Sequence, residues 1–554
     1  MQNMKRLLIL CKARRHEGTK ARNNFLFRAF APSCFRAFVL LLIISLYPGL
    51  QAQTYYKTHI PNKYVKENVF LTMEADTSIP PTFEAIKSKL PEPYWPVRPE
   101  VVESYWRIWE LEFSYLHPVT KENDFVSPYI EPPFSGDIFM WDACFVALMT
   151  QYGHRAFSFT RSLDNFYRKQ HPDGFICRQI SMKNGLDIFE RFDPSSTGPN
   201  LLPWPEWEYF IHLNDTVRLK NVFPPLLAFY QWYRTNRTWP DGSYFSSGWG
   251  CGMDNQPRLP KGEEYDPRFS HGFVSWIDIT LQQLFVGKIL IQMADILGRQ
   301  NDVKSIEEEV KALTVFVQKN MWDEKTAFFY DRLRDGKLNY VQSIAAYWSL
   351  LAGVISPEKA ERFIQHLENP DKFARKHRIP TLAADNPDYD PNGYWLGPVW
   401  PPTNYMTLKG LTKFKKDSLA HEIAFNHVTN VSKIYKKTGT FWENYHPDSI
   451  LGIAMKDFVD WNSLLVNNLF EYVFGFRADV PKNTLLIDVR LTDEYGVKNY
   501  PFGKNGLLDI DCKKRQKATD KPSLTIQSNI PLTIILNWRN GEITKTINPG
   551  KIKL

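Results

Sequence analysis

Helical periodicity runs almost without interruption from residue 100 to residue 477 of this 554-residue chain. Apolar residues there recur every three or four positions, which is the spacing of an amphipathic helix. Some segments also begin with clear start signals, such as Ser356-Pro357-Glu358, where a capping residue precedes proline in the first turn. The pattern predicts a mainly α fold. We expect about twelve helical segments, at residues 101–115, 138–152, 157–170, 204–213, 216–236, 274–298, 302–320, 340–354, 357–368, 399–414, 417–436 and 460–474.

The connections between these predicted helices alternate between short and long. The long ones are rich in Gly, Pro and aromatic residues and cover residues 128–137, 193–203, 238–273 and 380–398. Loops of that length inside a compact domain usually carry function. Helices of middling length, paired by this alternation, predict a closed ring of helical hairpins in which the long loops gather at one end.

The regions on either side of the helical part differ from it in character. Residues 478–554 contain short alternating or β-branched runs, and Asn540-Gly541 has the composition of a hairpin turn. These runs lie at residues 484–491, 523–527 and 532–538. We therefore expect a small β domain over residues 478–554. Residues 53–100 are rich in Pro and poor in helix signals, which predicts an N-terminal strap packed on a helical domain of residues 101–477.

The first 52 residues have the composition of a secretory signal peptide. Nine Lys or Arg residues face a single acid, Glu17, and an apolar run at 38–46 is followed by the small-residue segment Leu50-Gln51-Ala52. We therefore expect export to the periplasm or the extracellular space. The apolar run is shorter than the roughly 20 residues of a membrane-spanning helix, and no later stretch approaches that length, so we expect no transmembrane segment.

This leader also accounts for the charge of the chain. Its formal charge equals the net charge of +8 of the whole sequence, so the remaining residues are formally neutral and the pI of 8.9 reflects the leader. Binding to nucleic acid needs a basic surface. We therefore expect no nucleic-acid partner.

Nothing in the sequence has the spacing of a metal site. The cysteines beyond the leader, Cys144, Cys177, Cys251 and Cys512, form no CxxC pair and no set with metal-ligand spacing. Residues 385–393 resemble a calcium-binding loop only superficially, because the positions of Pro and the missing terminal Glu depart from that pattern. We therefore expect no metal and no cofactor.

Two carboxylates, Asp254 and Glu443, stand among turn formers and aromatic residues rather than on charged helix faces. Asp254 lies in the segment 252–258 and Glu443 in the segment 439–447. A lone carboxylate of this kind is more often a helix cap or a structural hydrogen-bonding group. Two of them far apart in sequence are also what cleavage of a glycosidic bond requires, one as general acid and one as general base. We interpret them as a catalytic pair because of the motifs around them.

Tryptophan residues gather on the Gly- and Pro-rich loops of the same region. Aromatic residues make up 15% of the chain, and most of them must be core, but clusters on such loops are hard to explain by packing alone. A pyranose ring has apolar faces that stack on indoles and hydroxyls that need carboxylates and amides. The pattern therefore predicts a sugar-binding site. The substrate-binding residues that we expect are Trp141, Asp142, Asn200, Asn255, Arg258, Trp395, Gly397, Trp400, Asn404 and Trp442.

Two of these residues have a second interpretation. Asp142 lies in the first turn of a predicted helix, where an acid also complements the helix dipole. Arg258 is close enough in sequence to Asp254 to be its structural partner, and such a partner would lower the pKa of the carboxyl and oppose an acid role.

The order of the motifs resembles that of the six-hairpin (α/α) toroid glycosidases. The segments are Trp141-Asp142, then Gly252-Met253-Asp254-Asn255 with Pro257 and Arg258, then Tyr394-Trp395 with Gly397-Pro398 and Trp400-Pro401-Pro402, then Gly439-Thr440-Phe441-Trp442-Glu443-Asn444-Tyr445. The chain is most similar to glycoside hydrolase family 63 and the mannosylglycerate-hydrolase-like group, and more distantly to family 37 trehalases. The resemblance covers roughly residues 100–475, and its last two motifs are specific.

This resemblance implies a fold and a mechanism. The fold would be an (α/α)6 toroid over residues 101–477 with the small β domain at its C-terminal side. Asp254 would be the general acid and Glu443 the general base of an inverting reaction. The chain departs from the group at Leu396, where Arg is usual, and at Gln256 and Cys251, where Ser is usual. These departures concern the substrate and not the type of reaction.

Together these features predict an exported, inverting glycoside hydrolase that acts on an oligosaccharide or a small glycoside. It would cleave a terminal α-linked sugar, in the manner of an α-glucosidase or α-mannosidase, and we expect a monomer. One alternative is a trehalase-like disaccharide hydrolase. Another is a polysaccharide lyase on the same toroid, with Tyr445 and His446 as its proton-transfer pair, but few Arg residues in the motif loops could neutralise a uronate. A third is a catalytically silent glycan-binding protein.

Overall fold

The computed structural model describes residues 60–131, 135–260 and 262–554. Residues Asn62–Leu554 form one compact unit. The predicted leader, residues 1–52, and the beginning of the predicted strap lie outside the described residues. Among the helices that the structure describes, none is long and apolar enough to cross a membrane.

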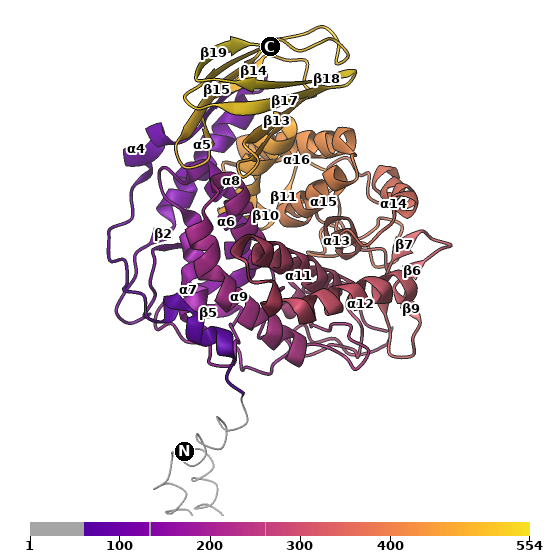
Figure 1. Cartoon of the computed structure of the whole chain (residues 1–554). Helices are drawn as coiled ribbons and strands as arrows, with labels where there is room; N and C mark the ends of the chain where they lie inside the picture. Colours follow the sequence, from indigo (N-terminus) through magenta and orange to yellow (C-terminus); the bar gives the residue numbers. More distant parts are fainter. Residues whose placement is uncertain (1–59, 132–134, 261) are drawn as a thin grey trace, which may run out of the picture. The chain divides into compact units, whose positions relative to one another are not determined.

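Helices dominate the unit between residues 99 and 473, and every segment predicted to be helical contains helix (Figure 1). The long helices are α5 (Pro99–Ser114), α6 (Met140–Gly153), α8 (Pro203–Leu213), α9 (Thr216–Asn236), α11 (Ile277–Leu297), α12 (Lys304–Asn320), α15 (Pro401–Lys413) and α16 (Asp417–Thr438). The shorter ones are α4 (Phe83–Ile86), α7 (Ser162–Arg168), α10 (Gly248–Cys251), α13 (Trp348–Ala352), α14 (Pro357–Ile364), α17 (Val459–Asn462) and α18 (Leu464–Asn468). The mainly α fold class is confirmed, whereas α4 and α10 were not predicted.

Contacts between the helices close a circuit. Along it α6 packs on α8, α8 on α11, α11 on α13, α13 on α15, α15 on α18, and α18 again on α6. A second set of helices lies against this circuit: α7 contacts α6, α9 contacts α8 and α11, α12 contacts α11, and α16 contacts α15. The chain therefore alternates between helices of the circuit and helices that pack beside it.

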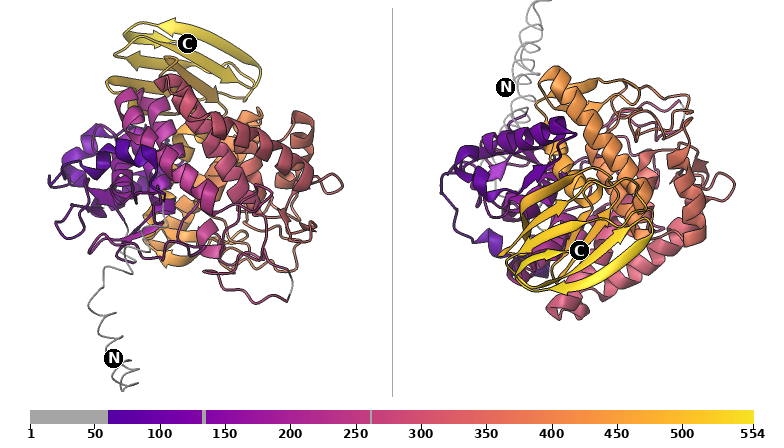
Figure 2. Two further views of the ribbon diagram at one scale, coloured as in Figure 1. Left: turned by 60° about the horizontal axis from the view of Figure 1, so that its bottom comes forward. Right: turned by 90° about the horizontal axis from the view of Figure 1, so that it is seen from above.

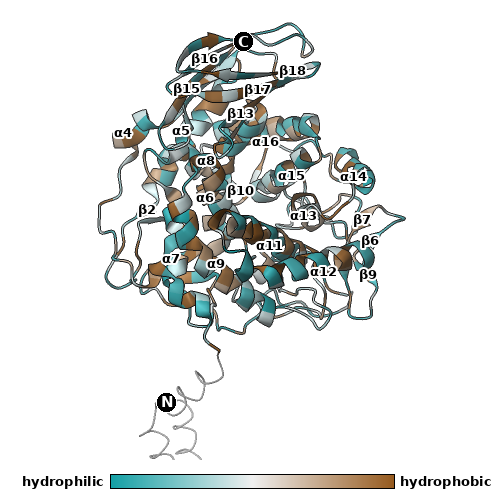
Figure 3. Ribbon diagram, in the orientation of Figure 1, coloured by the Kyte–Doolittle hydropathy of each residue, from teal (hydrophilic) through white to brown (hydrophobic). Residues whose placement is uncertain are grey.

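Burial differs sharply between α6 of the circuit and α12 beside it. Every residue of α6 is buried, whereas α12 buries only Ile306, Val310, Leu313 and Val317, which form a single stripe. A helix that is buried all round must be enclosed by protein, whereas a single apolar stripe belongs to a helix at the surface. Figure 3 shows both hydrophilic and hydrophobic colours on α12. The core of the unit is therefore built around the helices of the circuit.

The C-terminal region is rich in strands, as predicted. One sheet has the strand order β1-β14-β15-β16-β19 and the other β12-β13-β17-β18, and within them only the β13–β17 pair is parallel. The strands are β1 (Glu92–Tyr94), β12 (Phe476–Asp479), β13 (Thr484–Val489), β14 (Tyr495–Phe502), β15 (Gly506–Cys512), β16 (Leu524–Ser528), β17 (Leu532–Trp538), β18 (Gly541–Ile547) and β19 (Gly550–Lys553). Because β1 lies in the predicted strap and pairs with β14, this part of the strap is a strand of the C-terminal sheet.

The hairpin between β17 and β18 differs by one residue from the predicted turn. Trp538 pairs with Gly541, so Arg539 and Asn540 form the tip. A side chain at Gly541 would collide with the ring of Trp538. Glycine is therefore needed at this position for packing on the strand and not for the turn itself.

The sheets attach to the C-terminal ends of the helices. The backbone N–H of Val480 donates to the carbonyl of Ile211, and that of Gly503 donates to the carbonyl of His212, both in the last turn of α8. The left view of Figure 2 shows the C-terminal strands at one end of the helical part, and the right view, from above, shows them in front of the helices. The long loop that precedes α8 lies at its other end, so the strands and that loop lie at opposite ends of the helix.

Candidate active site

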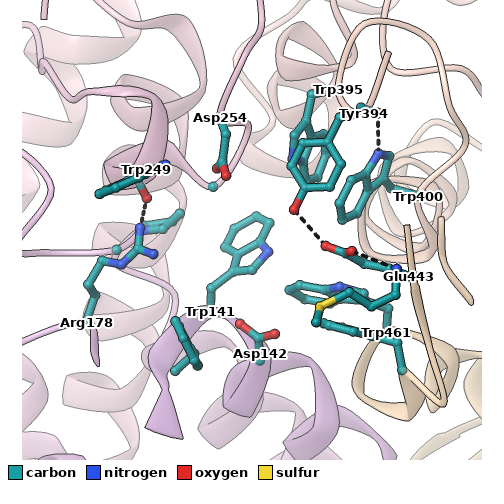
Figure 4. Close-up of a pocket in the computed structure, with 16 residues that line it drawn as sticks. Trp141, Asp142, Arg178, Trp249, Asp254, Tyr394, Trp395, Trp400, Glu443 and Trp461 are labelled. Atoms are coloured by element: carbon teal, nitrogen blue, oxygen red, sulfur yellow. Dashed lines mark hydrogen bonds between the residues drawn. The ribbon is translucent and has the colours of Figure 1, made fainter. Parts of the chain in front are cut away.

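A cavity of about 180 Å³ opens among the long loops, at the N-terminal ends of α6, α8, α15 and α17 (Figure 4). Helix N-termini carry a partial positive charge, which favours carboxylates and other negative groups nearby. The cavity is lined by Phe139, Trp141, Asp142, Arg178, Gly198, Pro199, Trp249, Gly252, Asp254, Tyr394, Trp395, Trp400, Glu443, Met455, Phe458 and Trp461. The structure thus brings both predicted catalytic carboxylates to one site, together with Trp141, Asp142, Trp395 and Trp400.

Half of the sixteen residues that line the cavity are aromatic, and five of these are Trp. Trp395 and Trp400 stack with ring centroids 3.7 Å apart and planes 10° from parallel, and Trp461 meets Trp400 edge-on at 6.4 Å. Trp141 lies against the backbone of Gly252, where an added Cβ would come within 3.3 Å of the indole. Flat apolar walls of this kind suit the faces of a sugar ring.

Asp254 follows the short helix α10 and faces the cavity. Burial raises the pKa of its carboxyl from 3.8 to about 6, and the guanidinium of Arg178 opposes this shift only in part. The hydroxyl of Tyr265 donates to the backbone carbonyl of Asp254 and fixes the segment. A carboxyl that keeps its proton close to neutral pH is suited to act as a general acid.

Glu443 lies on strand β10 (Trp442–Tyr445), which pairs with β11 (Gly452–Lys456). Its Oε1 accepts a hydrogen bond from the Tyr394 hydroxyl at 2.7 Å, and its Oε2 accepts one from the backbone N–H of Met455 at 3.4 Å. Burial raises the pKa of Glu443, and both donors act against that shift because they stabilise the ionised form. Glu443 therefore has two fixed donors that favour the carboxylate, as a general base requires.

The two residues that follow Glu443 on the strand, Asn444 and Tyr445, are not its donors. The side-chain amide of Asn444 is buried and forms no hydrogen bond with any described residue. The hydroxyl of Tyr445 donates to Asn462 at 2.6 Å instead. The stabilising hydroxyl comes from Tyr394, on a loop that is distant in sequence.

Asp142 and Arg178 complete the polar part of the cavity. Asp142 is only 6% exposed, and burial raises its pKa; Arg178 opposes the shift, and the charges of Glu443 and Asp254 add to it. Arg178 donates to the carbonyl of Trp249. Arg178 acts on Asp142 and Asp254, and Glu443 adds a third negative group nearby. These three carboxyls cannot all be ionised in a buried site, so protons remain bound to some of them.

Arg178 was not predicted as a site residue. It stands outside the aromatic loops and reaches the cavity because β5 (Gln179–Ser181) pairs with β4 (Asp137–Phe139), and because the N–H of Met140 donates to the Arg178 carbonyl. That pairing places Arg178 beside the first turn of α6. Only knowledge of the strand pairing could have revealed it.

Aromatic lining residues beyond those predicted are Phe139, Trp249, Tyr394, Phe458 and Trp461. Tyr394 and Trp249 lie in the long loops that the sequence had already marked, so the same argument could have included them. Trp461 lies within a predicted helix, where an indole is usually core, and no local signal distinguishes it.

Arg258 does not line the cavity, in contrast to the prediction. Its guanidinium forms buried ion pairs with Asp278 at 2.7 Å and Asp331 at 2.6 Å, and it lies over the ring of Trp276. A buried guanidinium needs such partners, because an unpaired charge in the interior is costly. It is therefore neither a substrate contact nor the partner of Asp254; the cation that acts on Asp254 is Arg178.

Asn200 and Asn404 are buried behind the cavity and do not line it. Asn200 Nδ2 donates to Gln283 at 3.1 Å, and Asn404 Oδ1 accepts from the N–H of Ile379 at 3.0 Å. Both amides therefore satisfy groups inside the protein. Their side chains hold the loops in place. The spacing of the motifs could not distinguish this structural role from sugar binding.

The other predicted contacts, Asn255, Gly397 and Trp442, also lie beside the cavity rather than in its wall. The Trp442 indole donates to the Thr438 hydroxyl at 3.1 Å. A Cβ at Gly397 would come within 2.6 Å of the Asp390 carbonyl, so glycine serves close packing of the loop. In the described part of the chain, no group of three His, Cys, Asp or Glu residues is arranged to hold a metal ion.

Comparison with known proteins identifies similar sequences. The family model of the mannosylglycerate hydrolase MGH1-like glycoside hydrolase domain matches residues 137–458, which include Asp254 and Glu443. An uncharacterized protein of Borreliella burgdorferi is 23% identical over 393 residues, or 68% of this chain and 80% of the relative. The mannosylglycerate hydrolase of Thermus thermophilus is 23% identical over 347 residues, or 51% of this chain and 83% of the relative. A probable mannosyl-oligosaccharide glucosidase of Schizosaccharomyces pombe is 25% identical over 280 residues, which are 46% of this chain but only 34% of the relative.

Solved structures share the fold. A GH63 mannosylglycerate hydrolase from Thermus thermophilus, in complex with Tris and D-glycerate, matches with a TM-score of 0.53 at 22% identity, over 67% of this chain and 99% of that one. A neutral trehalase from Saccharomyces cerevisiae matches with a TM-score of 0.50 at 13% identity, over 61% of this chain and 73% of that one. At these identities the likeness concerns the fold alone.

Proposed function

Because the chain belongs to the family of mannosylglycerate hydrolase MGH1-like glycoside hydrolase domains, we propose that it is an inverting glycosidase that removes a terminal α-linked sugar. The observation that carries this proposal is the contrast between two carboxyls of one cavity. Burial raises the pKa of Asp254 to about 6, while Glu443 accepts hydrogen bonds from Tyr394 and Met455. One group is suited to give a proton and the other to take one.

The fold that we propose for the helical part is an (α/α)6 toroid. The closed circuit α6-α8-α11-α13-α15-α18 supports an inner ring, and the helices packed beside it support an outer one. In such a ring, the loops at the N-terminal ends of the inner helices meet at a single mouth. The cavity lies at those ends, where the four predicted motif segments contribute Trp141, Asp254, Trp400 and Glu443.

The reaction follows from these two groups. Asp254 donates its proton to the glycosidic oxygen while the bond from that oxygen to the anomeric carbon breaks. Glu443 accepts a proton from a water molecule, whose oxygen attacks the anomeric carbon from the opposite face. The freed sugar then has the opposite anomeric configuration. This route requires the two carboxyl groups to be roughly 6.5–9.5 Å apart, so that water fits between base and sugar.

The cavity also supports removal of a single terminal sugar. Its volume of about 180 Å³ is small beside the roughly 300–1,000 Å³ of pockets for drug-sized ligands. It therefore suits one sugar ring better than a stretch of polysaccharide. The indoles of Trp141 and Trp461 would face that ring, while Asp142 and Arg178 would bind its hydroxyls.

The three alternative functions receive different degrees of support from the site. A lyase was expected to use Tyr445 and His446, but Tyr445 is buried, bonded to Asn462, and outside the cavity wall. That alternative therefore loses its proton-transfer pair. A trehalase-like hydrolase would use the same acid and base, so only the substrate distinguishes it. A silent glycan-binding protein would not need two carboxyls in opposed environments.

The deciding experiment is incubation with a panel of α-linked glucosides and mannosides, including trehalose and mannosylglycerate, with proton NMR of the first product. We expect one member of the panel to be hydrolysed and the fresh sugar to carry inverted configuration. Retained configuration would indicate a covalent glycosyl-enzyme route, and an unsaturated product would indicate a lyase. Binding without any turnover across the panel would favour the silent alternative.

We also propose export, on the basis of the sequence of residues 1–52, which lie outside the described residues. The basic stretch, apolar run and small-residue segment support it. Fractionation of cells that express the full chain, with N-terminal sequencing of the product, tests it. A protein that stays in the cytoplasm with its leader intact would contradict the proposal.

A further inference from the structure

Tyr394, which holds the general base, has an unusual backbone. Its φ is 64°, in the left-handed region that bulky side chains rarely adopt. A residue in that region persists only where its surroundings hold it there. Its hydroxyl reaches Glu443 from this conformation (Figure 4). The position of the donor therefore depends on whatever fixes the backbone on either side of Tyr394.

One side chain holds both neighbours of Tyr394. Asn255 Nδ2 donates to the carbonyl of Gly393 at 2.9 Å, and Asn255 Oδ1 accepts from the N–H of Trp395 at 3.0 Å. An asparagine amide matches this pair because it offers one donor and one acceptor at once. Asn255 itself is exposed and lies outside the cavity wall, so it acts on the site only through the loop.

Further bonds fasten the same loop. Gln256 Nε2 donates to the carbonyl of Trp395 at 3.2 Å, and the indole N–H of Trp400 donates to the carbonyl of Tyr394 at 3.0 Å. Asn255 and Gln256 directly follow Asp254 in sequence. The segment that carries the acid is therefore bonded to the loop that orients the base.

We propose that Asn255 is a positioning residue that ties the segment of the general acid Asp254 to the loop of Tyr394, so that the Tyr394 hydroxyl stays on Glu443. The inference rests on the proposed function, since it concerns the same acid and base. It adds a residue that touches neither substrate nor reacting atoms but sets the geometry between the two carboxyls.

The proposal has a specific consequence for the base. The titratable groups that act on Glu443 are Tyr394, Asp254 and Asp142. Of these, the Tyr394 hydroxyl favours the ionised base, and the charges of the two aspartates oppose it. Release of the loop weakens the Tyr394 bond, so Glu443 holds its proton up to a higher pH. The acidic limb of the pH profile of kcat/KM should therefore move upward.

The first test is a double-mutant cycle with Asn255→Ala and Tyr394→Phe. Asn255→Ala should lower kcat/KM about ten- to hundredfold and move the acidic limb upward, toward the position it has in Tyr394→Phe. In the Tyr394→Phe background, the Asn255 substitution should add little further shift, because both act through one bond. Asn392→Ala, at an exposed position of the same loop, is the matched control and should leave the profile unchanged. Additive shifts, or an unmoved limb in Asn255→Ala, would overturn the proposal.

The second test needs no substrate and so separates this proposal from the proposed function. Hydrogen exchange of the full chain should show faster exchange at the Trp395 amide in Asn255→Ala than in wild type or Asn392→Ala. Asn255→Asp keeps the acceptor for Trp395 but loses the donor to Gly393, and should give a smaller increase. If the chain hydrolyses no glycoside but exchange rises in this order, the proposed function fails and the tie between the two segments stands. Unchanged exchange at Trp395 in Asn255→Ala would refute the tie in either case.

Discussion

The two ends of the helices of the circuit differ in how their buried charges are paired. At the N-terminal ends, Asp142 and Asp254 share the guanidinium of Arg178, Glu443 lies in the same cavity, and burial raises the pKa of each carboxyl. Further along α8 and α15, Lys409 lies between Glu208 at 2.9 Å and Glu471 at 3.7 Å.

The cluster of Lys409, Glu208 and Glu471 shows how pairing changes the pKa of a buried carboxyl. Burial alone would raise the pKa of Glu208, but the charges of Lys409 and His212 and the hydrogen bonds from Lys409 and Trp204 together outweigh it, and the pKa is lowered. Glu471 also accepts a hydrogen bond from the Tyr405 hydroxyl at 2.8 Å. Removal of one partner from such a cluster is costly, whereas Asp142 and Asp254, whose charges one cation offsets only in part, keep protons available for chemistry.

The largest effect should come from removing either member of the acid–base pair. Asp254→Asn and Glu443→Gln should each lower kcat by about 10²–10⁴-fold, because each removes one proton transfer while the shape of the side chain is kept. Steady-state kinetics with the accepted glycoside, together with circular dichroism to show an intact fold, checks this. Near-normal rates in both variants would mean that other carboxyls act.

Removal of the charge at the opposite end should affect stability instead. Lys409→Met leaves Glu208 and Glu471 buried without their cation and should destabilise the protein by about 3–5 kcal/mol. The rate per folded molecule should stay unchanged, because Lys409 lies away from the cavity. Urea unfolding and active-site titration separate the two quantities. An unchanged urea midpoint would contradict the claim that the buried charges at the two ends have different roles.

A smaller effect on catalysis is expected from the aromatic wall. Trp249→Ala should lower kcat/KM about tenfold, the scale of one stacking contact, with little loss of stability because the side chain is only half-buried. Trp239 is half-buried on the same long loop and does not line the cavity, so Trp239→Ala is the matched control. Equal losses in the two variants would show that loop packing, and not stacking on the sugar, is responsible.

The smallest expected effect is a change in melting temperature, whose sign should differ between variants at the two ends. The pKa of Asp254 is raised to about 6 from 3.8, so the folded state binds its proton more tightly, and this contribution to stability is lost as pH rises between those values. Asp254→Asn should therefore raise Tm above wild type at pH 7, and this gain should fade below pH 4.

The matched variant at the other end should behave in the opposite way. The pKa of Glu208 is lowered by Lys409, so Glu208→Gln removes a favourable charge and should lower Tm at pH 7. Calorimetry over a pH series checks both variants. Changes of the same sign would show that the two ends do not differ in pairing.

Periodicity and turn chemistry predicted most of the fold. The segment predicted at 216–236 has the bounds of α9, since a capping Asp215 and a long apolar pattern are local signals. Asp254 and Glu443 were also found from local signals, because carboxylates among Gly and Trp on loops are unusual. These predictions needed no knowledge of how distant segments meet.

The errors lie where distant segments meet. Arg258 is next to the acid in sequence but is held by Asp278 and Asp331, whereas Arg178 reaches the cavity through a strand pairing. Asn200 stands in a motif yet faces the interior. Which way a loop side chain points depends on partners far along the chain, and local patterns do not contain that information.

The most direct test of the central claim compares the pH dependence of kcat/KM for two substrates. One is the natural glycoside, and the other carries the same sugar on an aryl leaving group that needs no protonation. With the natural glycoside, the rate should fall above about pH 6, because Asp254 loses the proton that it must donate. With the activated aryl glycoside, Asp254→Asn should retain much of the wild-type rate and show no fall in that range. A fall near pH 6 that persists in Asp254→Asn would contradict the assignment of Asp254 as the general acid.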